Sequence, residues 1–476
     1  MSAGSTSELR GPVPVDKQRT FAALFVAASA VFIAFAATES GQLEAFGVLI
    51  GAMLALPAIL WRWPYGAFAT LFAAAAVPRI SLKLFGLNMK VEHAIATLIA
   101  VCFLVFFRRR VQKLISIDYF LLGFLWITYV SSAAYSPQPG TTLKNAAIFT
   151  LAVLPYWILR ELIKDANSLQ KAMPLFLIIG ALEAIYGIFC FTGNALFGSK
   201  LGITYYYYLG ALTAVHGSQW EPNIFGSYVC SFAAMFFCLY LQRDRARRWY
   251  LAGLAITGFA ALLSLARAAW IGLVVAGAMC LFLRVGFRNL VRRLLVPALI
   301  VTCIIALGAA LALRIDAVHE RASSLSPDTV LEDPTLVHRM VFIDLALNDI
   351  VAHPWFGMGS NSFGVLWDWE TEEGTEPAWV GNIFIRIWHD GGLLGLTLFL
   401  AFAGTLLSRA WKLFRKERSS VLGNVAAALL VGLVVLTVAF QATEASTLAY
   451  TWVHLGLLRA FISVSQQPNQ DLIIRG

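Results

Sequence analysis

The chain has 476 residues, of which 59% are hydrophobic and only 13% are charged, and its formal net charge is +9. A soluble domain is closer to half apolar and a quarter charged, so this composition excludes an ordinary soluble protein. The apolar residues come in long blocks, and a bilayer core needs about 20 such residues per helix. We therefore expect an all-α polytopic membrane protein with about 12–14 transmembrane helices, because only internally hydrogen-bonded segments are stable in lipid.

About fourteen apolar segments are candidates for these helices, and the third and fourth are short enough to be re-entrant. In chain order they cover residues 20–37, 43–61, 65–78, 93–107, 118–135, 143–160, 172–195, 224–242, 249–266, 268–284, 294–313, 387–408, 422–440 and 447–464. They predict an N-terminal tail (1–19), transmembrane helices 1–11 (20–313), a large loop (314–381), transmembrane helices 12–14 (382–464) and a C-terminal tail (465–476).

The basic residues indicate the orientation of the chain. Most of the 36 Lys and Arg fall in short segments on the same side as the N-terminus, such as 108–113, 243–248 and 409–418. Cytoplasmic loops are enriched in these residues, so both termini are expected in the cytoplasm of a bacterial cell, with the protein in the inner (plasma) membrane. Topology thus accounts for the positive charge, and no nucleic-acid partner is expected. The six cysteines all lie in apolar segments, which predicts neither a disulfide nor a metal site.

The loop 314–381 lies on the periplasmic side in this topology and is much longer than the other connections. Loops of this length are usually functional or disordered, and the tryptophans in this one argue against disorder. Residues 336–352 carry apolar side chains at helical spacing, which predicts an amphipathic helix on the outer membrane face. The helix is expected to end at His353-Pro354, where a glycine-rich turn begins.

Arg267 interrupts a long apolar stretch, at the outer end of the ninth and tenth spans. An arginine at this depth costs a few kcal/mol unless it is paired or faces water. Its guanidinium suits phosphate oxygens, which indicates an anion site. The alternative is an arginine of a turn that snorkels to the outer lipid headgroups.

Two further groups are candidates with ordinary structural alternatives. Arg339 lies on the expected loop helix, where it is either functional or an exposed helix charge. Glu221, Pro222 and Asn223 open the eighth span, where Pro222 suits the first helical turn and Asn223 could cap the helix.

A third group lies at the start of the twelfth span. Asn382, Arg386 and His389 would share one helical face, followed by the glycine-rich stretch 391–395. Polar residues on one face of a membrane helix usually line an interior cavity. The alternative is snorkelling at the outer surface, with the glycines serving helix packing.

Taken in order, these motifs resemble one family of bacterial inner-membrane enzymes, the O-antigen ligases and polysaccharide polymerases. The resemblance covers about residues 170–410. It rests on Glu221-Pro222-Asn223; on Ser264 to Trp270, which is similar to the family's Ser-Arg-Gly-Ala-Trp stretch; on Arg339 followed by Pro354 to Gly359; and on Asn382 followed by Gly391-Gly392-Leu393-Leu394-Gly395.

The resemblance implies a glycosyltransferase with an undecaprenyl-diphosphate-linked oligosaccharide as donor. The acceptor would be lipid A–core in a ligase, or another lipid-linked glycan in a polymerase. Arg267 would bind the donor diphosphate and stabilise it as a leaving group, so neither a metal nor another cofactor is expected. Arg339 and Asn382 would belong to the catalytic set. A flippase and a chain-length regulator would be candidate partners.

The chain departs from the family pattern at two places. The family usually has a histidine directly before the asparagine, as general base or as the residue that positions the acceptor, and Gly381 stands there in this chain. His389, about two turns later, is expected to replace it. Some members also carry an arginine before the Pro-Asn motif. Here Lys200 and His216 are its nearest equivalents, and they are expected to bind the donor together with Glu221 and Asn223. The missing histidine favours a polymerase over a ligase.

Two other functions stay open at the level of sequence. A buried arginine also fits an anion transporter, although transporters usually place the substrate site near the midplane between related halves. Here the polar residues gather on one side and no internal repeat is apparent. The third reading is a non-catalytic partner in a glycan assembly complex.

Overall fold

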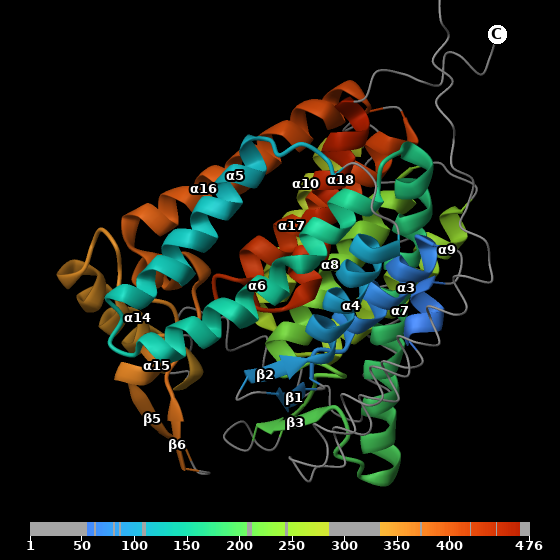
Figure 1. Cartoon of the computed structure of the whole chain (residues 1–476). Helices are drawn as coiled ribbons and strands as arrows, with labels where there is room; N and C mark the ends of the chain where they lie inside the picture. The colour runs from blue at the N-terminus through green and yellow to red at the C-terminus, as the bar shows by residue number, and fades with distance from the viewer. Residues whose placement is uncertain are drawn as a thin grey trace, which may run out of the picture.

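The computed structural model (Figure 1) describes residues 55–60, 63–79, 81–84, 87–106, 111–206, 212–242, 246–284, 334–371, 374–418, 420–443 and 445–466. Most of these residues are helical. The helices are α3 (Tyr65–Ala76), α4 (Val91–Phe106), α5 (Ser116–Leu125), α6 (Pro139–Leu162), α7 (Ala166–Phe197), α8 (Pro222–Tyr240), α9 (Arg247–Leu263), α10 (Arg267–Arg284), α14 (Pro334–Ala352), α15 (Phe363–Leu366), α16 (Ile383–Lys416), α17 (Val421–Ala439) and α18 (Ala449–Gln466). A π-helical turn (Trp126–Val130) and a 3₁₀ turn (Ser131–Ala134) continue α5.

Among the described residues, six helical segments are long and apolar enough to cross a membrane. They are Ser116–Ala134, Pro139–Leu162, Ala166–Phe197, Pro222–Tyr240, Ile383–Lys416 and Val421–Ala439. Shorter apolar helices cover Tyr65–Ala76, Val91–Val105 and Arg267–Leu281. The all-α polytopic membrane fold expected from the sequence is thus confirmed. The spans expected at 20–37 and 294–313, and most of the one at 43–61, lie outside the described residues.

The connections contain structure that hydropathy did not indicate. Three two-stranded antiparallel hairpins are formed by β1 (Ser81–Leu84) with β2 (Leu87–Lys90), β3 (Ile203–Tyr206) with β4 (Leu212–Val215), and β5 (Asp368–Thr371) with β6 (Gly374–Pro377). The expected amphipathic loop helix is present as α14 and ends just before His353. Helix α16 begins earlier than the expected twelfth span and runs without a loop to Lys416.

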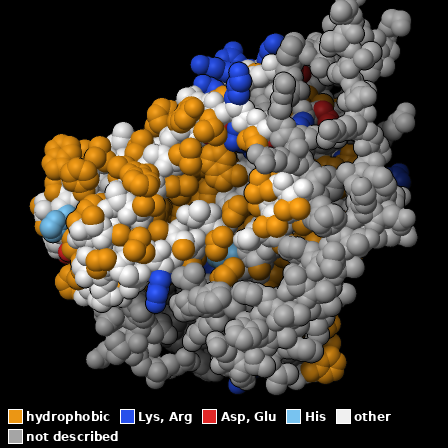
Figure 2. All heavy atoms as spheres, viewed as in Figure 1, with side chains coloured by type: hydrophobic (Ala, Val, Ile, Leu, Met, Phe, Trp, Pro, Cys, Tyr) orange, Lys and Arg blue, Asp and Glu red, His pale blue; other side chains and the backbone are white. Residues whose placement is uncertain are grey.

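The two ends of the helix bundle differ in composition. One end carries α14 and the hairpin β5–β6, and we term it the loop end (Figure 1). The opposite end, where α16 finishes with Arg415 and Lys416, is termed the basic end. Figure 2 shows Lys and Arg side chains gathered at the basic end and hydrophobic side chains over the flank between the two ends. The arrangement is that of a bundle whose flank faces lipid.

Helix α8 lies at the centre of the bundle and is buried along nearly its whole length. It packs against α9, α10 and α17, while α6 packs against α18. Aromatic rings fill the interface between α6 and α18, where Phe149 contacts Trp452 edge-on with 5.7 Å between the ring centroids. Such contacts bury large apolar surfaces, so they fix the relative positions of the helices that present polar residues at the loop end.

Helix α16 is broken within its membrane-spanning part. Gly392 has φ 63° and ψ −169°, so the helix stops there and starts again. The turn after α14 fills the break. Four backbone hydrogen bonds join them: Met358 N to His389 O (2.8 Å), Gly359 N to Asp390 O (3.0 Å), Leu393 N to Pro354 O (2.8 Å) and Leu394 N to Trp355 O (3.3 Å). Free backbone groups are costly in lipid, so both glycine-rich motifs of the sequence serve this join.

A buried ion pair joins α5 to α18 near the basic end. Asp118 accepts hydrogen bonds from Nε (3.0 Å) and Nη2 (2.8 Å) of Arg459 and from the hydroxyl of Tyr156 (2.9 Å). The Arg160 guanidinium lies 3.7 Å from the same carboxylate. Asp118 and Arg459 are almost completely inaccessible to solvent, so neither charge can be solvated if its partner is removed.

Replacing Asp118 with alanine should therefore destabilise the protein by about 3–5 kcal/mol, because Arg459 would stay buried without its carboxylate. The temperature of thermal unfolding of the purified protein in detergent measures the effect. The double variant Asp118→Leu/Arg459→Met should recover much of the loss, since it removes both charges. If Asp118→Ala unfolds at the same temperature as the wild type, the ion pair contributes little to the stability of the protein.

Candidate functional site

Arg267 is the first residue of α10 and lies at the loop end, directly after a tight turn. Leu265 in that turn has φ 53°, which is unusual for a residue with a side chain. The turn is tied down by the Ser264 hydroxyl, which donates to Ala261 O (2.7 Å), and by the Trp270 indole, which donates to the same carbonyl (2.8 Å). Arg267 itself is half-buried, whereas Ser264 is buried.

The start of α10 has two properties that favour an anion. The first backbone N–H groups of a helix have no partner within it, and the helix dipole places partial positive charge there. The guanidinium of Arg267 adds a full positive charge at the same helix end. Together they form a site suited to phosphate oxygens.

Helix α8 begins beside the Arg267 turn. A Cβ on Gly226 would lie 2.3 Å from Cβ of Ala266 and 2.7 Å from Oγ of Ser264, so only glycine allows this close approach. Glu221 precedes α8 by one residue and is its N-cap. It lies about 7.5 Å from Gly226 along the helix axis, given a rise of about 1.5 Å per residue. The approach therefore brings Glu221 and Arg267 to the same region of the loop end.

The Glu221 carboxylate has two described neighbours from distant parts of the chain. The Thr443 hydroxyl donates a hydrogen bond to Oε1 (2.8 Å), and Arg339 of α14 supplies a positive charge. Burial raises the pKa of Glu221, and the Thr443 hydrogen bond and the charge of Arg339 lower it in part. The balance leaves the pKa of Glu221 above the usual glutamate value, because burial disfavours the charged form.

Thr443 belongs to the connection between α17 and α18, and the same connection also contacts Asn382. The side-chain oxygen of Asn382 accepts from the N–H groups of Phe384 (3.0 Å) and Ile385 (3.1 Å), so Asn382 is the N-cap of α16. Its amide nitrogen donates to Oε1 of Gln441 (3.0 Å). Gln441 and Thr443 belong to one short connection, which therefore links Asn382 to Glu221.

His389, the residue expected to replace the missing histidine, is fully buried. Its Nε2 lies 3.2 Å from Oδ2 of Asp349 on α14, and its Nδ1 lies 3.0 Å from Oδ1 of Asp390. Asp349 also accepts from the indole of Trp367 (3.1 Å). These contacts join the loop helix to α16, and they leave neither ring nitrogen exposed to a substrate hydroxyl.

His216 and Lys200 lie near the hairpin β3–β4. His216 is buried, and its Nε2 lies 2.9 Å from Nη1 of Arg79. Burial and the charge of Arg79 both lower the pKa of His216, so its imidazole is neutral at neutral pH. Lys200 is exposed on the connection before the hairpin. Among the described residues, the positive charge that acts on His216 is that of Arg79.

The structure corrects one detail at the start of α8. Pro222 is the first helical residue, as expected, but the N-cap is Glu221, and Asn223 lies in the first turn. A cap precedes the first helical residue, and Pro222 suits the first position because it has no N–H to leave unpaired. Asn223 is half-buried there.

Several residues of this region were not anticipated: Thr443, Gln441, Arg79 and Asp349. Arg79 carried a usable signal, since it directly follows an apolar segment, as Arg267 does. Thr443 and Gln441 carried none, because they become important only when the connection between α17 and α18 folds over Glu221 and Asn382.

One segment of the chain is similar to a known protein family. Residues 252–400, which contain Arg267, α14 and the broken part of α16, match the model of the O-antigen ligase family. No protein of curated function matches the chain. The matched segment and the membrane-spanning helices agree with the resemblance seen in the motifs: the chain is a polytopic membrane protein whose residues 252–400 are similar to the O-antigen ligase family.

Proposed function

We propose that the protein is a glycosyltransferase that acts at the periplasmic face of a bacterial inner membrane on a glycan carried by undecaprenyl diphosphate. It would polymerise repeat units of a surface polysaccharide or ligate them to lipid A–core, and the first is favoured because Gly381 replaces the usual histidine. One observation carries the proposal. Arg267, at the start of α10 within the matched segment, directly follows Ala266, which packs against Gly226 of α8, five residues after Glu221.

In the proposed reaction, the donor diphosphate lies against Arg267 and the N-terminus of α10. The bond between the anomeric carbon and the diphosphate oxygen breaks, and the bonding electrons stay with the diphosphate. Arg267 and the helix N–H groups stabilise this added negative charge, and such fixed donors contribute strongly to catalysis. The proposed step uses the charge of arginine where another enzyme would use a metal ion.

The acceptor hydroxyl must lose a proton as its oxygen bonds to the anomeric carbon. We assign this proton to the Glu221 carboxylate, which would release it to water afterwards. A base works best when its pKa is near the working pH, and burial brings Glu221 closer to that value. Arg339 and Thr443 would position the carboxylate. His389 and Asn382 would act indirectly, by holding α14 and the α17–α18 connection on α16.

Glu221→Gln should reduce glycan transfer by about 10²–10⁴-fold, the usual contribution of a general base. In the wild type, transfer should rise with pH through a pKa above the normal glutamate range, because the protonated carboxyl cannot accept a proton. Thr443→Val removes a hydrogen bond that favours the carboxylate, so it should move this rise to higher pH. Initial rates in proteoliposomes across pH measure both effects.

Glu417→Gln at the basic end is the control for the loss of one carboxylate, and its pH profile should match the wild type. An unchanged profile in Thr443→Val, or full activity of Glu221→Gln, would remove Glu221 from the role of base. Retained activity of Glu221→Gln would still leave the proposed diphosphate site at Arg267 to be tested separately.

Deletion of the gene tests the function itself. Surface and secreted glycans of the deletion strain, with and without the wild-type gene, are compared on gels. Single repeats that remain attached without longer chains would identify a polymerase. Absence of all repeats from lipid A–core, with accumulation of lipid-linked polymer, would identify a ligase. Unchanged glycans in a strain without a second homologue would contradict both and favour the transporter.

A further inference from the structure

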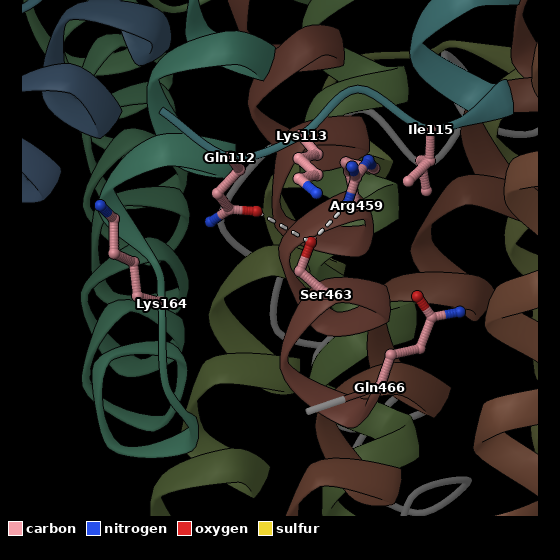
Figure 3. A pocket seen from close by; sticks show the side chains of 7 residues that line it. All are labelled: Gln112, Lys113, Ile115, Lys164, Arg459, Ser463 and Gln466. Carbon is pink, nitrogen blue, oxygen red and sulfur yellow. Dashed lines mark hydrogen bonds between the residues drawn. The ribbon is translucent and has the colours of Figure 1, made fainter. Parts of the chain in front are cut away.

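A second polar cavity lies at the basic end, far along the helices from Glu221 and Arg267. It has a volume of about 310 Å³ and is formed by the segment before α5, the turn between α6 and α7, and the last turns of α18 (Figure 3). Its lining residues are Gln112, Lys113, Ile115, Lys164, Arg459, Ser463 and Gln466. Three of the seven are basic and none is acidic.

The inner wall of this cavity is pre-formed. Arg459 is 2% exposed, and its guanidinium is held by Asp118 through two hydrogen bonds and donates a further one to Ser463. The Ser463 hydroxyl in turn donates to Oε1 of Gln112 (3.2 Å), and the Gln112 amide donates to Arg160 O (2.6 Å). The polar groups facing the cavity are thus fixed by the protein and need little ordering when a ligand binds.

The charges of the inner wall balance one another, and the lining of the cavity adds two lysines. Behind the wall, Arg459 and Arg160 face the carboxylates of Asp118 and Glu161. Lys113 and Lys164 are added to this balanced set. Figure 3 shows the Lys113 side chain directed toward Arg459 and Ser463, with Lys164 on the opposite side of Gln112. The side chains that line the cavity therefore include three cations and no carboxylate.

The position of the cavity relates it to the membrane. Lys113 is flanked by Val111 and Leu114, which are 60% and 38% exposed, and Tyr119 on the first turn of α5 is 60% exposed. Large apolar side chains that stay exposed beside a cation mark the boundary between headgroups and hydrocarbon. A basic pocket between helices at this depth has the chemistry that binds the phosphate of a lipid headgroup.

We propose that this cavity binds the phosphate of an anionic phospholipid in the leaflet at the basic end, with the acyl chains along the exposed apolar side of α5. The phosphate would take hydrogen bonds from the Lys113 ammonium and from the second N–H of the Gln112 amide. The lipid would join α5, the α6–α7 turn and α18, three elements that are far apart in the sequence. This inference does not depend on the proposed glycosyltransferase function.

The test uses the full-length protein in detergent with added dioleoylphosphatidylglycerol. Its dissociation constant is measured by native mass spectrometry, and the rise in unfolding temperature is recorded in parallel. Lys113→Gln/Lys164→Gln should weaken binding by about thirtyfold, since each lysine near a membrane surface contributes about 1 kcal/mol. The control Lys412→Gln/Lys416→Gln removes the same charge from the exposed end of α16 and should bind as the wild type does.

Three comparisons decide the result. Lys113→Arg/Lys164→Arg keeps the charge and should retain binding, which separates charge from a folding defect. Equal weakening in both Lys→Gln pairs would place the lipid elsewhere and overturn the site. The same stabilisation by inorganic phosphate at millimolar concentration, with none from the lipid, would identify a soluble phosphate ligand and overturn the lipid. Dioleoylphosphatidylcholine should bind at least tenfold more weakly than the anionic lipid.

Discussion

Arg267→Ala should reduce glycan transfer by about 10²–10³-fold, the cost of removing one fixed donor from a developing negative charge. The guanidinium lies at the first residue of α10, where the helix N-terminus already favours an anion, so no other described side chain of that turn can supply the charge. Arg267→Lys should retain part of the activity, because an ammonium keeps the charge but loses the planar pair of donors. Transfer is measured in the deletion strain at matched membrane levels of each variant.

Arg248→Ala is the matched control, because this arginine is exposed at the opposite end of α9. It should transfer glycan as the wild type does. Full activity of Arg267→Ala would show that Arg267 does not bind the donor and would favour its contact with lipid headgroups. The donor would then have to bind at another site. Equal losses in Arg267→Ala and Arg248→Ala would indicate a general effect on the protein.

Gly392→Ala should abolish the native arrangement of the loop end, although residue 392 bears no functional group. The backbone conformation alone costs about 1–3 kcal/mol for a residue with a Cβ. The added Cβ would also lie 2.3 Å from the carbonyl carbon of Trp355, and a backbone atom cannot move away without breaking the hydrogen bonds that fill the helix break. The unfolding temperature should fall clearly, and protease should cut more readily within 353–362.

Gly404→Ala on the same helix provides the control, because a Cβ there would meet nothing within 4 Å. It should leave the protein unchanged or stabilise it by up to about 1 kcal/mol, as alanine is the better helix former. Wild-type stability of Gly392→Ala would mean that the helix can continue through residue 392. The inserted turn would then contribute little to the fold.

Hydropathy predicted the helices well, since each membrane-spanning segment must satisfy its own backbone and therefore carries its signal locally. The helices α6, α7, α8, α17 and α18 lie where apolar segments were expected. The hairpins and the break in α16 were not predicted. Their strands are only four residues long, and the break depends on a partner segment more than thirty residues earlier, so neither has a periodic pattern to detect.

The candidate site was predicted in part for the same reason. Arg267 and Glu221 stand out because a charge in or beside an apolar segment is costly, and that cost is visible in the sequence. The same signal marked His389, but the structure gives it Asp349 and Asp390 as neighbours, which explains its presence in the helix without a substrate. A charged residue in a membrane helix can be stabilised by a ligand or by other side chains of the protein. Which of the two applies depends on contacts between distant parts of the chain, and no local sequence pattern contains them.

The inserted turn in the break of α16 also bears on how the protein is made. Residues 354–359 leave the ribosome before Gly392, so the segment that completes the broken helix is synthesised first. When α16 enters the bilayer, residues 354–359 already exist and can form hydrogen bonds with its free N–H and C=O groups. A permuted gene in which α16 is translated before the loop would present the open break to lipid, and its product should insert poorly even though every residue is retained.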